Sequence, residues 1–169
     1  MLKIINELMP FFEDCYRRIN VREYAKIIHV SPPTASNLLE KYHKENLLLK
    51  TRFKNYILYY ANKESKTFID LSRIYWREKL KELTVHLEGT LVNPTIILFG
   101  SLSKAETKSD SDVDLAVFAH KKELRTGIFE KKLKRRIQFF WLSSIKKIKT
   151  KELANNIING YVIIGKLSL

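Results

Sequence analysis

The chain has 169 residues, enough for one ordinary domain or two small ones, and 45% are hydrophobic, which excludes wholesale disorder. Lys and Arg number 31 against 18 acidic residues, a formal charge of +13 with a pI near 9.8. This charge favours polyanionic partners such as nucleic acid or nucleotides, and the alternative is a merely solubilising surface.

The sequence also limits the cellular setting. No apolar run approaches the roughly 18 to 20 residues that span a bilayer, and acids interrupt the apolar N-terminus “MLKIINELMPFFEDC”, unlike a signal peptide. The single cysteine, Cys15, excludes an intramolecular disulfide. We therefore expect a cytoplasmic protein that does not associate with membranes.

Residues 1–64 predict a winged helix-turn-helix domain. Asn20 and Glu23 form a capping box, and apolar residues follow at helical spacing. The stretch “SPPT”, after the short turn “HV”, starts a second amphipathic helix. Two such helices that share a core are typical of a helix-turn-helix. An earlier helix begins near Leu2, and Pro10 is expected to kink or shorten it.

Two strand-like runs, “NLLLKTRF” and “YILYYA”, then bracket a turn and predict a hairpin where a winged helix carries its wing. If the apolar side of the second helix faces inward, its polar side and the basic hairpin face outward, towards phosphates and base edges. The predicted nucleic-acid-binding residues are Thr34, Asn37, Lys41, Lys44, Lys50, Arg52 and Lys54. A scaffold or protein-binding role is the alternative, because a fold alone does not fix function.

Residues 65–91 predict one connecting helix. Apolar residues recur at helical spacing from Thr67 to about Glu88, and Gly89 and Pro94 bracket the end. Its apolar face would pack on one or both flanking domains. A heptad dimer seam is the alternative, although the stripe is short and irregular.

Residues 92–169 contain a residue pattern that indicates a metal- and phosphate-binding site. The run “PTIILFGS” predicts a strand ending at Gly100 and Ser101, and “DVDLAVFA” predicts another. Residues two apart on a strand share a face, so Asp112 and Asp114 project together. Two carboxylates about 6–7 Å apart repel each other, and a divalent cation such as Mg²⁺ or Mn²⁺ removes that penalty. The Gly-Ser step lets backbone N–H groups and a hydroxyl approach a phosphate.

Residues 99–101, “FGS”, and 111–115, “SDVDL”, resemble the signature of the DNA polymerase β nucleotidyltransferase superfamily. The resemblance covers about Val92 to Lys166, includes the closing “ELANNIINGYVIIGK”, and fits the size of the minimal nucleotidyltransferases. The N-terminal half resembles the winged helices that are fused to such domains in archaeal proteins.

The resemblance implies a magnesium-dependent transfer of a nucleoside monophosphate from an NTP to a hydroxyl or similar acceptor. Gly100, Ser101 and Ser111 would bind the nucleotide. Asp112 and Asp114 would be the catalytic residues and would bind the metal ions, Mg²⁺ or Mn²⁺. In this chemistry the protein mainly positions the reactants.

Two positions depart from the family pattern. The family often has a second loop glycine where this chain has Ala105, a mild change unless that position needs a positive φ. Active members usually carry a third carboxylate on a later strand, where this chain has Gln138 in “RIQFFWLS”. A neutral amide cannot serve as a base.

The predicted fold is thus α+β: a winged helix-turn-helix, a connecting helix, and a nucleotidyltransferase-like domain with a small mixed sheet. The leading function is nucleotidyl transfer that the winged helix targets to nucleic acid, duplex DNA above all, or to a partner protein. The first alternative is a DNA-binding regulator, in which a catalytically weakened second domain senses nucleotide or oligomerises. The second is an antitoxin that acts beside a partner toxin. A homodimer would fit the habits of winged helices.

Overall fold

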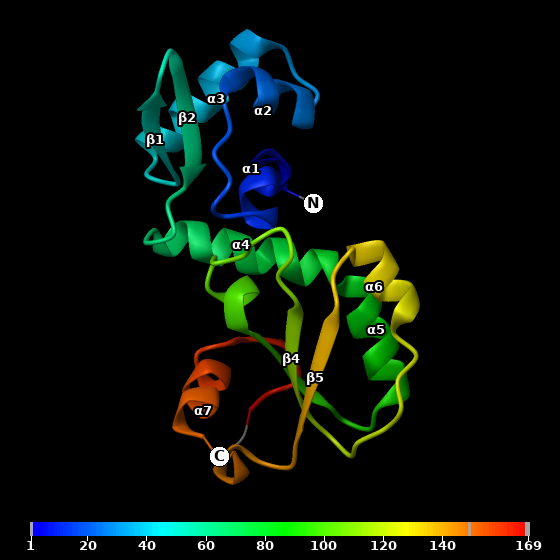
Figure 1. The fold of residues 1–169 in the computed structure, drawn as a ribbon. Coiled ribbons are helices and arrows are strands. Elements are labelled where there is room, and N and C mark those ends of the chain that lie inside the picture. The colour runs from blue at the N-terminus through cyan, green and yellow to red at the C-terminus, as the bar shows by residue number, and fades with distance from the viewer. Residues whose placement is uncertain (1, 149, 168–169) are drawn as a thin grey trace. The chain divides into compact units, whose positions relative to one another are not determined.

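A computed structural model describes residues 2–148 and 150–167 and shows a mixed α+β protein with two small sheets, which confirms the predicted class (Figure 1). The chain divides into two compact units. The first comprises residues 2–75 and a returning segment, Ala105–Ser109, and the second comprises Trp76–Lys104 and residues 110–167. No helix in the described part of the chain has the length and apolar character to cross a membrane.

The first unit begins with three helices, α1 (Lys3–Glu13), α2 (Val21–Ile27) and α3 (Pro32–Lys44). Both capping signals in the sequence are used. The Asn20 side chain accepts a hydrogen bond from the N–H of Glu23 at 3.0 Å, and the Ser31 hydroxyl accepts one from the N–H of Thr34 at 3.4 Å. These caps satisfy backbone donors that the first turn of a helix leaves unpaired.

Helix α1 continues past Pro10 to Glu13, so of the two effects expected of this proline, a kink or a shortened helix, the proline does not itself end the helix. Leu8, Phe11 and Phe12 are completely buried. A proline inside a helix costs about 3 kcal/mol, whereas burying one large apolar side chain contributes about 1.5–3 kcal/mol. The three buried side chains on this face therefore outweigh the lost hydrogen bond.

Strands β1 (Leu48–Phe53) and β2 (Tyr56–Ala61) form an antiparallel hairpin in which Phe53 lies opposite Tyr56, next to the turn. The backbone N–H and C=O of Ile19 both bond with Tyr59 on the other edge of β2. This pairing joins the hairpin to the segment before α2.

Two helices, α4 (Lys66–Lys79) and α5 (Lys81–Thr90), occupy the region for which the sequence predicted one. The break falls at Leu80, whose φ of −87° and ψ of 0° leave the helical region. Leu80 and Leu83 are both buried, so the apolar spacing continues across the break and conceals it in the sequence.

The second unit contains a four-stranded sheet in the order β5-β4-β3-β6. Strands β4 and β5 are parallel and the other pairs are antiparallel, so the sheet is mixed. Its elements, in chain order after α5, are β3 (Thr95–Phe99), the 3-10 turn η1 (Gly100–Ser103), β4 (Val113–Phe118), α6 (Gly127–Leu133), β5 (Ile137–Leu142), the 3-10 turn η2 (Ile145–Lys147), α7 (Lys151–Ile158) and β6 (Tyr161–Ile164).

One face of this sheet packs against α7. Ile97, Phe99 and Ala116 form a buried cluster with Ile157 of α7. Phe140 packs against the cluster, with its ring edge-on to that of Phe99 at 5.0 Å. Figure 1 shows α5 and α6 on the opposite side of the sheet from α7. The apolar core under α7 thus fixes the ends of β3, β4 and β5, where the signature residues lie.

Candidate active site

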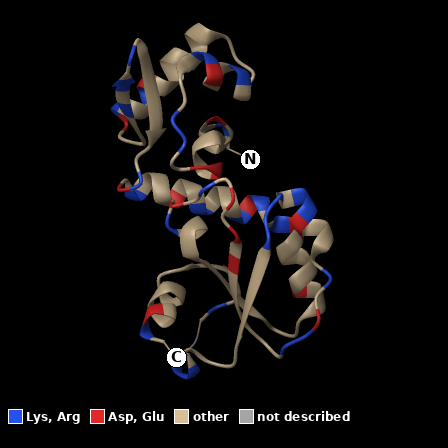
Figure 2. Ribbon diagram, viewed as in Figure 1, with Lys and Arg blue, Asp and Glu red and all other residues tan. Residues whose placement is uncertain are grey.

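The signature acids lie where the apolar face of the sheet ends. Asp114 is the second residue of β4 and lies between Phe99 of β3 and Gln138 of β5 in the sheet register. Side chains two apart on a strand share a face, so Asp114 points to the same side as Ala116, which packs under α7. Asp112 comes just before the strand. Figure 2 shows the acidic colour at this end of β4.

Gly100 sits directly against the Asp114 carboxylate. Its φ of +71° belongs to the left-handed region, and a β-carbon at this position would overlap Asp114 Oδ2. The Ser103 hydroxyl donates to the Gly100 carbonyl at 2.9 Å and fixes the η1 turn. Conformation and space therefore both require glycine here, and the result is a backbone turn packed on a carboxylate.

The carboxylates of Asp112 and Asp114 place two like charges beside each other, which is electrostatically unfavourable. The pKa of Asp114 is raised, first because burial withdraws the half-buried carboxyl group from water, and second because Asp112 carries a like charge. Among the described residues, no third acid, histidine or cysteine joins them in a metal-binding cluster. A cation at this place would relieve the cost of ionising Asp114.

Gln138 occupies the neighbouring position on β5. It lies opposite Asp114 in the register, and its Nε2 donates to Asp112 Oδ2 at 2.5 Å. The amide thus orients Asp112 and satisfies one of its oxygens. It supplies a donor at a place where a third carboxylate would supply another acceptor.

Another acid near this strand has a structural role. The carboxylate of Glu130, on α6, accepts a hydrogen bond at 2.9 Å from the N–H of Ile137, the first residue of β5. Glu130 therefore satisfies a backbone donor at the start of the strand.

Arg135 is a site-supporting residue that the sequence did not reveal. It is 7% exposed, its guanidinium lies over the Trp76 ring at 5.1 Å, and its Nη1 donates to the Ser111 carbonyl at 2.6 Å. This bond holds the backbone directly before Asp112. In the sequence the residue is hidden within the cationic run “KKLKRR”, which looks like a solvated surface.

The loop between the two signature segments returns to the first unit, where Ala105 and Thr107 are completely buried. The N–H of Cys15 donates to the Thr107 carbonyl at 2.8 Å. Burial raises the pKa of the Cys15 thiol to about 11, so this cysteine is poorly reactive. Ala105 has a φ of +55°, so the position is one where glycine is favoured, and alanine costs about 1–2 kcal/mol there.

All seven residues predicted to bind nucleic acid are exposed on the first unit. Lys41 and Lys54 lie over the rings of Tyr42 and Phe53. Two others have a hydrogen-bond or ion-pair partner. The Thr34 hydroxyl is within hydrogen-bond distance of the Ser31 hydroxyl, and Lys50 pairs with Glu40 at 3.0 Å. The residues Asn37, Lys41, Lys44, Arg52 and Lys54 complete the set.

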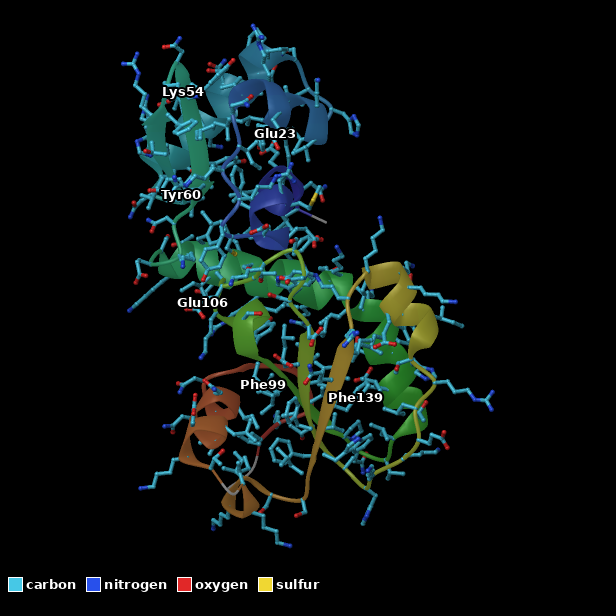
Figure 3. All side chains as sticks on the ribbon, viewed as in Figure 1. Glu23, Lys54, Tyr60, Phe99, Glu106 and Phe139 are labelled. Carbon is cyan, nitrogen blue, oxygen red and sulfur yellow. The ribbon has the colours of Figure 1, made fainter. Side chains whose placement is uncertain are left out.

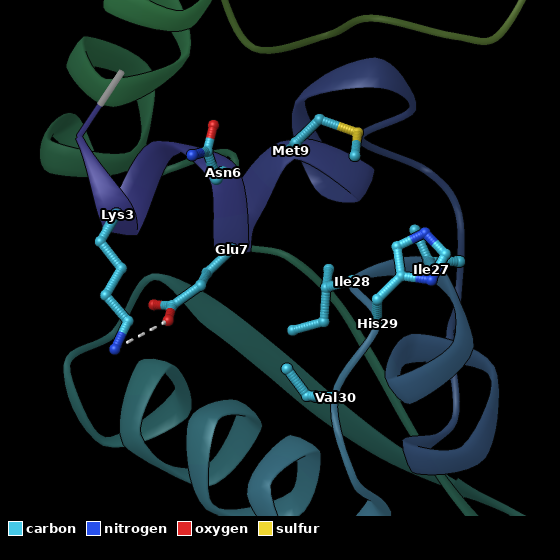
Figure 4. Close-up of a pocket in the computed structure, with 8 residues that line it drawn as sticks. All are labelled: Lys3, Asn6, Glu7, Met9, Ile27, Ile28, His29 and Val30. Carbon is cyan, nitrogen blue, oxygen red and sulfur yellow. Dashed lines mark ion pairs between the residues drawn. The ribbon is translucent and has the colours of Figure 1, made fainter.

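A cavity of about 360 Å³ lies in the first unit, between α1 and the turn that precedes α3 (Figure 4). An ion pair of 3.8 Å joins Lys3 and Glu7 at its edge. The other lining residues are Asn6, Met9, Ile27, Ile28, His29 and Val30. This mainly apolar lining contains none of the predicted nucleotide or nucleic-acid ligands and is unlike a phosphate site.

Comparison with known proteins agrees with the geometry. Residues 78–167, just over half of the chain, match the family described as polymerase beta, nucleotidyltransferase. No curated protein and no solved structure matched the chain. The matched segment contains Gly100, both signature aspartates and Gln138. The chain therefore belongs to the polymerase beta nucleotidyltransferase family.

Proposed function

We propose that this protein transfers a nucleoside monophosphate from an NTP to a nucleic-acid or protein acceptor. The observation that carries the proposal is the packing of the Gly100 turn on the Asp114 carboxylate, with Asp112 beside it. Backbone N–H groups of the turn, with the hydroxyls of Ser101 and Ser111, would hold the triphosphate. Family membership supports the class of reaction, and the donor and acceptor are part of the proposal.

The carboxylate pair fits a hard divalent cation, because the half-buried Asp114 carboxyl, whose pKa is raised by burial and by the like charge of Asp112, would gain from a cation between the two acids. Asp112 and Asp114 would hold Mg²⁺ or Mn²⁺, which when bound supplies charge neutralisation at the phosphates. The chain's own contribution is positioning. Gln138 orients Asp112, and Arg135 fixes the backbone of Ser111.

Gln138 favours a second candidate function. Its amide cannot accept the proton of an attacking hydroxyl, and a general base contributes about 10²–10⁴-fold to a rate. The hydrogen bond from Gln138 to Asp112 also stabilises the site without a third acid. A domain that binds nucleotide and transfers it slowly, within a DNA-binding regulator, is therefore the alternative.

We propose that α1 to β2 act as a winged helix that targets duplex DNA. The order of three helices and a hairpin supports this assignment, and so does the exposure of the predicted contact residues on α3 and the hairpin. Phosphate contacts by lysine and arginine would supply most of the affinity.

Substituting Lys41→Ala or Arg52→Ala is expected to weaken duplex binding. Each change should also reduce the magnitude of the negative slope of log affinity against log salt by about 1. Both residues are exposed on the proposed surface. The measurement is fluorescence anisotropy with a labelled duplex over a salt series. Lys66→Ala, an exposed lysine at the start of α4, is the matched control and should leave the slope unchanged. Equal slopes in all four proteins would rule out the targeting role.

Substituting Gly100→Ala is expected to abolish Mg²⁺-dependent NTP binding, because the new β-carbon displaces the Asp114 carboxylate. Gly165→Ala is the matched control. Gly165 directly follows β6 and has a φ of +72°. A β-carbon there would lie 2.7 Å from the Pro94 carbonyl oxygen. Each change should lower the free energy of unfolding by about 1–3 kcal/mol.

Calorimetric titration with NTP and Mg²⁺ separates strain from function in these two variants. Gly165→Ala should bind nucleotide like the wild type at a temperature where both are folded. Retained binding by Gly100→Ala, or an equal loss in both variants, would show that the Gly100 turn does not contribute to nucleotide binding.

A further inference from the structure

The β1–β2 hairpin has a face with no assigned role. Side chains at alternate positions of the paired strands share a face, and the inner set includes Leu48, Tyr59 and Ala61, which are buried. The same set contains Lys50, Arg52 and Ile57. We define the outer face of the hairpin by the alternate residues: Leu49, Thr51, Phe53, Tyr56, Leu58 and Tyr60. Phe53 and Tyr56 are directly opposite each other, and each is 57% exposed. Two aromatic side chains at paired positions are thus largely exposed to solvent.

This face lies in a segment without negative charge. Residues 46–63 contain Lys50, Arg52, Lys54 and Lys63 but no aspartate or glutamate. The Lys54 ammonium lies 5.7 Å from the centre of the Phe53 ring, and the Arg18 guanidinium lies 5.4 Å from that of Tyr60. Figure 3 shows Lys54 at the turn of the hairpin and Tyr60 near its base, and Figure 2 shows basic residues along it.

We propose that the outer face of the hairpin binds single-stranded nucleic acid, with bases stacked on Phe53 and Tyr56 and phosphates held by Lys54 and Arg18. Unpaired bases offer planar faces that stack on aromatic side chains, whereas the bases of a duplex are already stacked on each other. The surface differs from the duplex-facing side of α3, and this binding is independent of nucleotidyl transfer.

The charge distribution decides between the possible occupants. Two copies of this chain that met through this face would bring two acid-free cationic hairpins together, which repel each other. A polyanion that carries planar rings matches both features, since its phosphates complement the cations and its bases complement the rings. An anionic lipid surface is also negatively charged, but it offers no planar rings for stacking. Aromatic and aliphatic side chains of the hairpin would therefore bind it equally well.

The proposal is tested with two double variants of the full-length protein. Phe53→Ala with Tyr56→Ala removes the rings, and Phe53→Leu with Tyr56→Leu keeps apolar surface without planar rings. Ile57→Ala is the matched control, because Ile57 is 48% exposed on the opposite side of the same hairpin. The probes are a fluorescein-labelled single strand of mixed sequence, as RNA and as DNA, the corresponding duplex, and phosphatidylserine vesicles.

Both double variants should weaken single-strand binding by about 5- to 150-fold for each stacked base that is lost, with an unchanged salt slope because no cation is removed. Ile57→Ala should bind like the wild type, and duplex affinity should change less than twofold. Retained single-strand binding by the leucine variant would overturn the proposal, as would equal losses on duplex and single strand. Vesicle binding that the leucine variant keeps, without single-strand binding by the wild type, would assign the face to lipid instead. Circular dichroism melts check that each variant is folded.

Discussion

Substituting Asp114→Asn is expected to stabilise the metal-free protein at neutral pH and to abolish its Mg²⁺-dependent nucleotide binding. The raised pKa of Asp114 means that the folded state binds a proton more tightly than the unfolded chain does. Stability therefore falls as the pH rises from the ordinary aspartate pKa, about 3.9, through the raised value. At pH 7 the ionised carboxylate costs folding free energy that the asparagine avoids.

The measurement is thermal unfolding of wild type and Asp114→Asn from pH 3 to pH 8, with and without Mg²⁺ and NTP. The two melting temperatures should converge below the ordinary aspartate pKa and separate as the pH rises. Mg²⁺ with NTP should raise the melting temperature of the wild type but not that of Asp114→Asn, because ligands stabilise the state that binds them.

Asp110→Asn is the matched control for these melts, since Asp110 is an exposed acid of the same loop. It should behave like the wild type in both respects. A variant Asp114→Asn that is less stable than the wild type at pH 7, or that still responds to Mg²⁺ with NTP, would contradict the proposed role of this carboxylate.

Substituting Gln138→Glu is expected to raise metal-dependent nucleotidyl transfer by about 10²–10⁴-fold, the usual contribution of a general base. Gln138 lies opposite Asp114 in the register and within 2.5 Å of Asp112, so the new carboxylate would join the existing pair. Without metal, three neighbouring acids should repel each other and lower the melting temperature.

Gln138→Leu separates the two roles of the side chain, because it removes the hydrogen bond to Asp112 without adding an acid. It should lower NTP affinity by loosening Asp112, since a hydrogen bond to a charged group contributes about 1.5–3 kcal/mol. Single-turnover transfer and calorimetry measure both effects. A rate that falls in Gln138→Glu would mean that the amide is itself part of a working site.

The sequence predicted those features that depend on local chemistry. The caps at Asn20 and Ser31 and the strand that leads into Gly100 are encoded within a few residues. The alternation of Asp112 and Asp114 with apolar residues was likewise enough to place both acids at the start of β4.

The remaining features depend on tertiary contacts. Gly100 meets Asp114 only because β3 and β4 pair in one register, and Arg135 reaches Ser111 only because α6 carries the chain to the edge of the sheet. The anchoring of Thr107 to Cys15 joins residues that lie far apart in the sequence. No local pattern specifies such meetings, so a cationic run concealed the role of Arg135.

Nucleotidyl transfer at this site is tested by label transfer from each α-labelled NTP with Mg²⁺ or Mn²⁺ to RNA, DNA or protein acceptors. The wild type is compared with a variant that carries both Asp112→Asn and Asp114→Asn. We expect a labelled acceptor with the wild type, dependent on the metal ion, and none with the variant. Equal labelling by both proteins, or no labelling by the wild type or by Gln138→Glu on any acceptor, would contradict nucleotidyl transfer at this site.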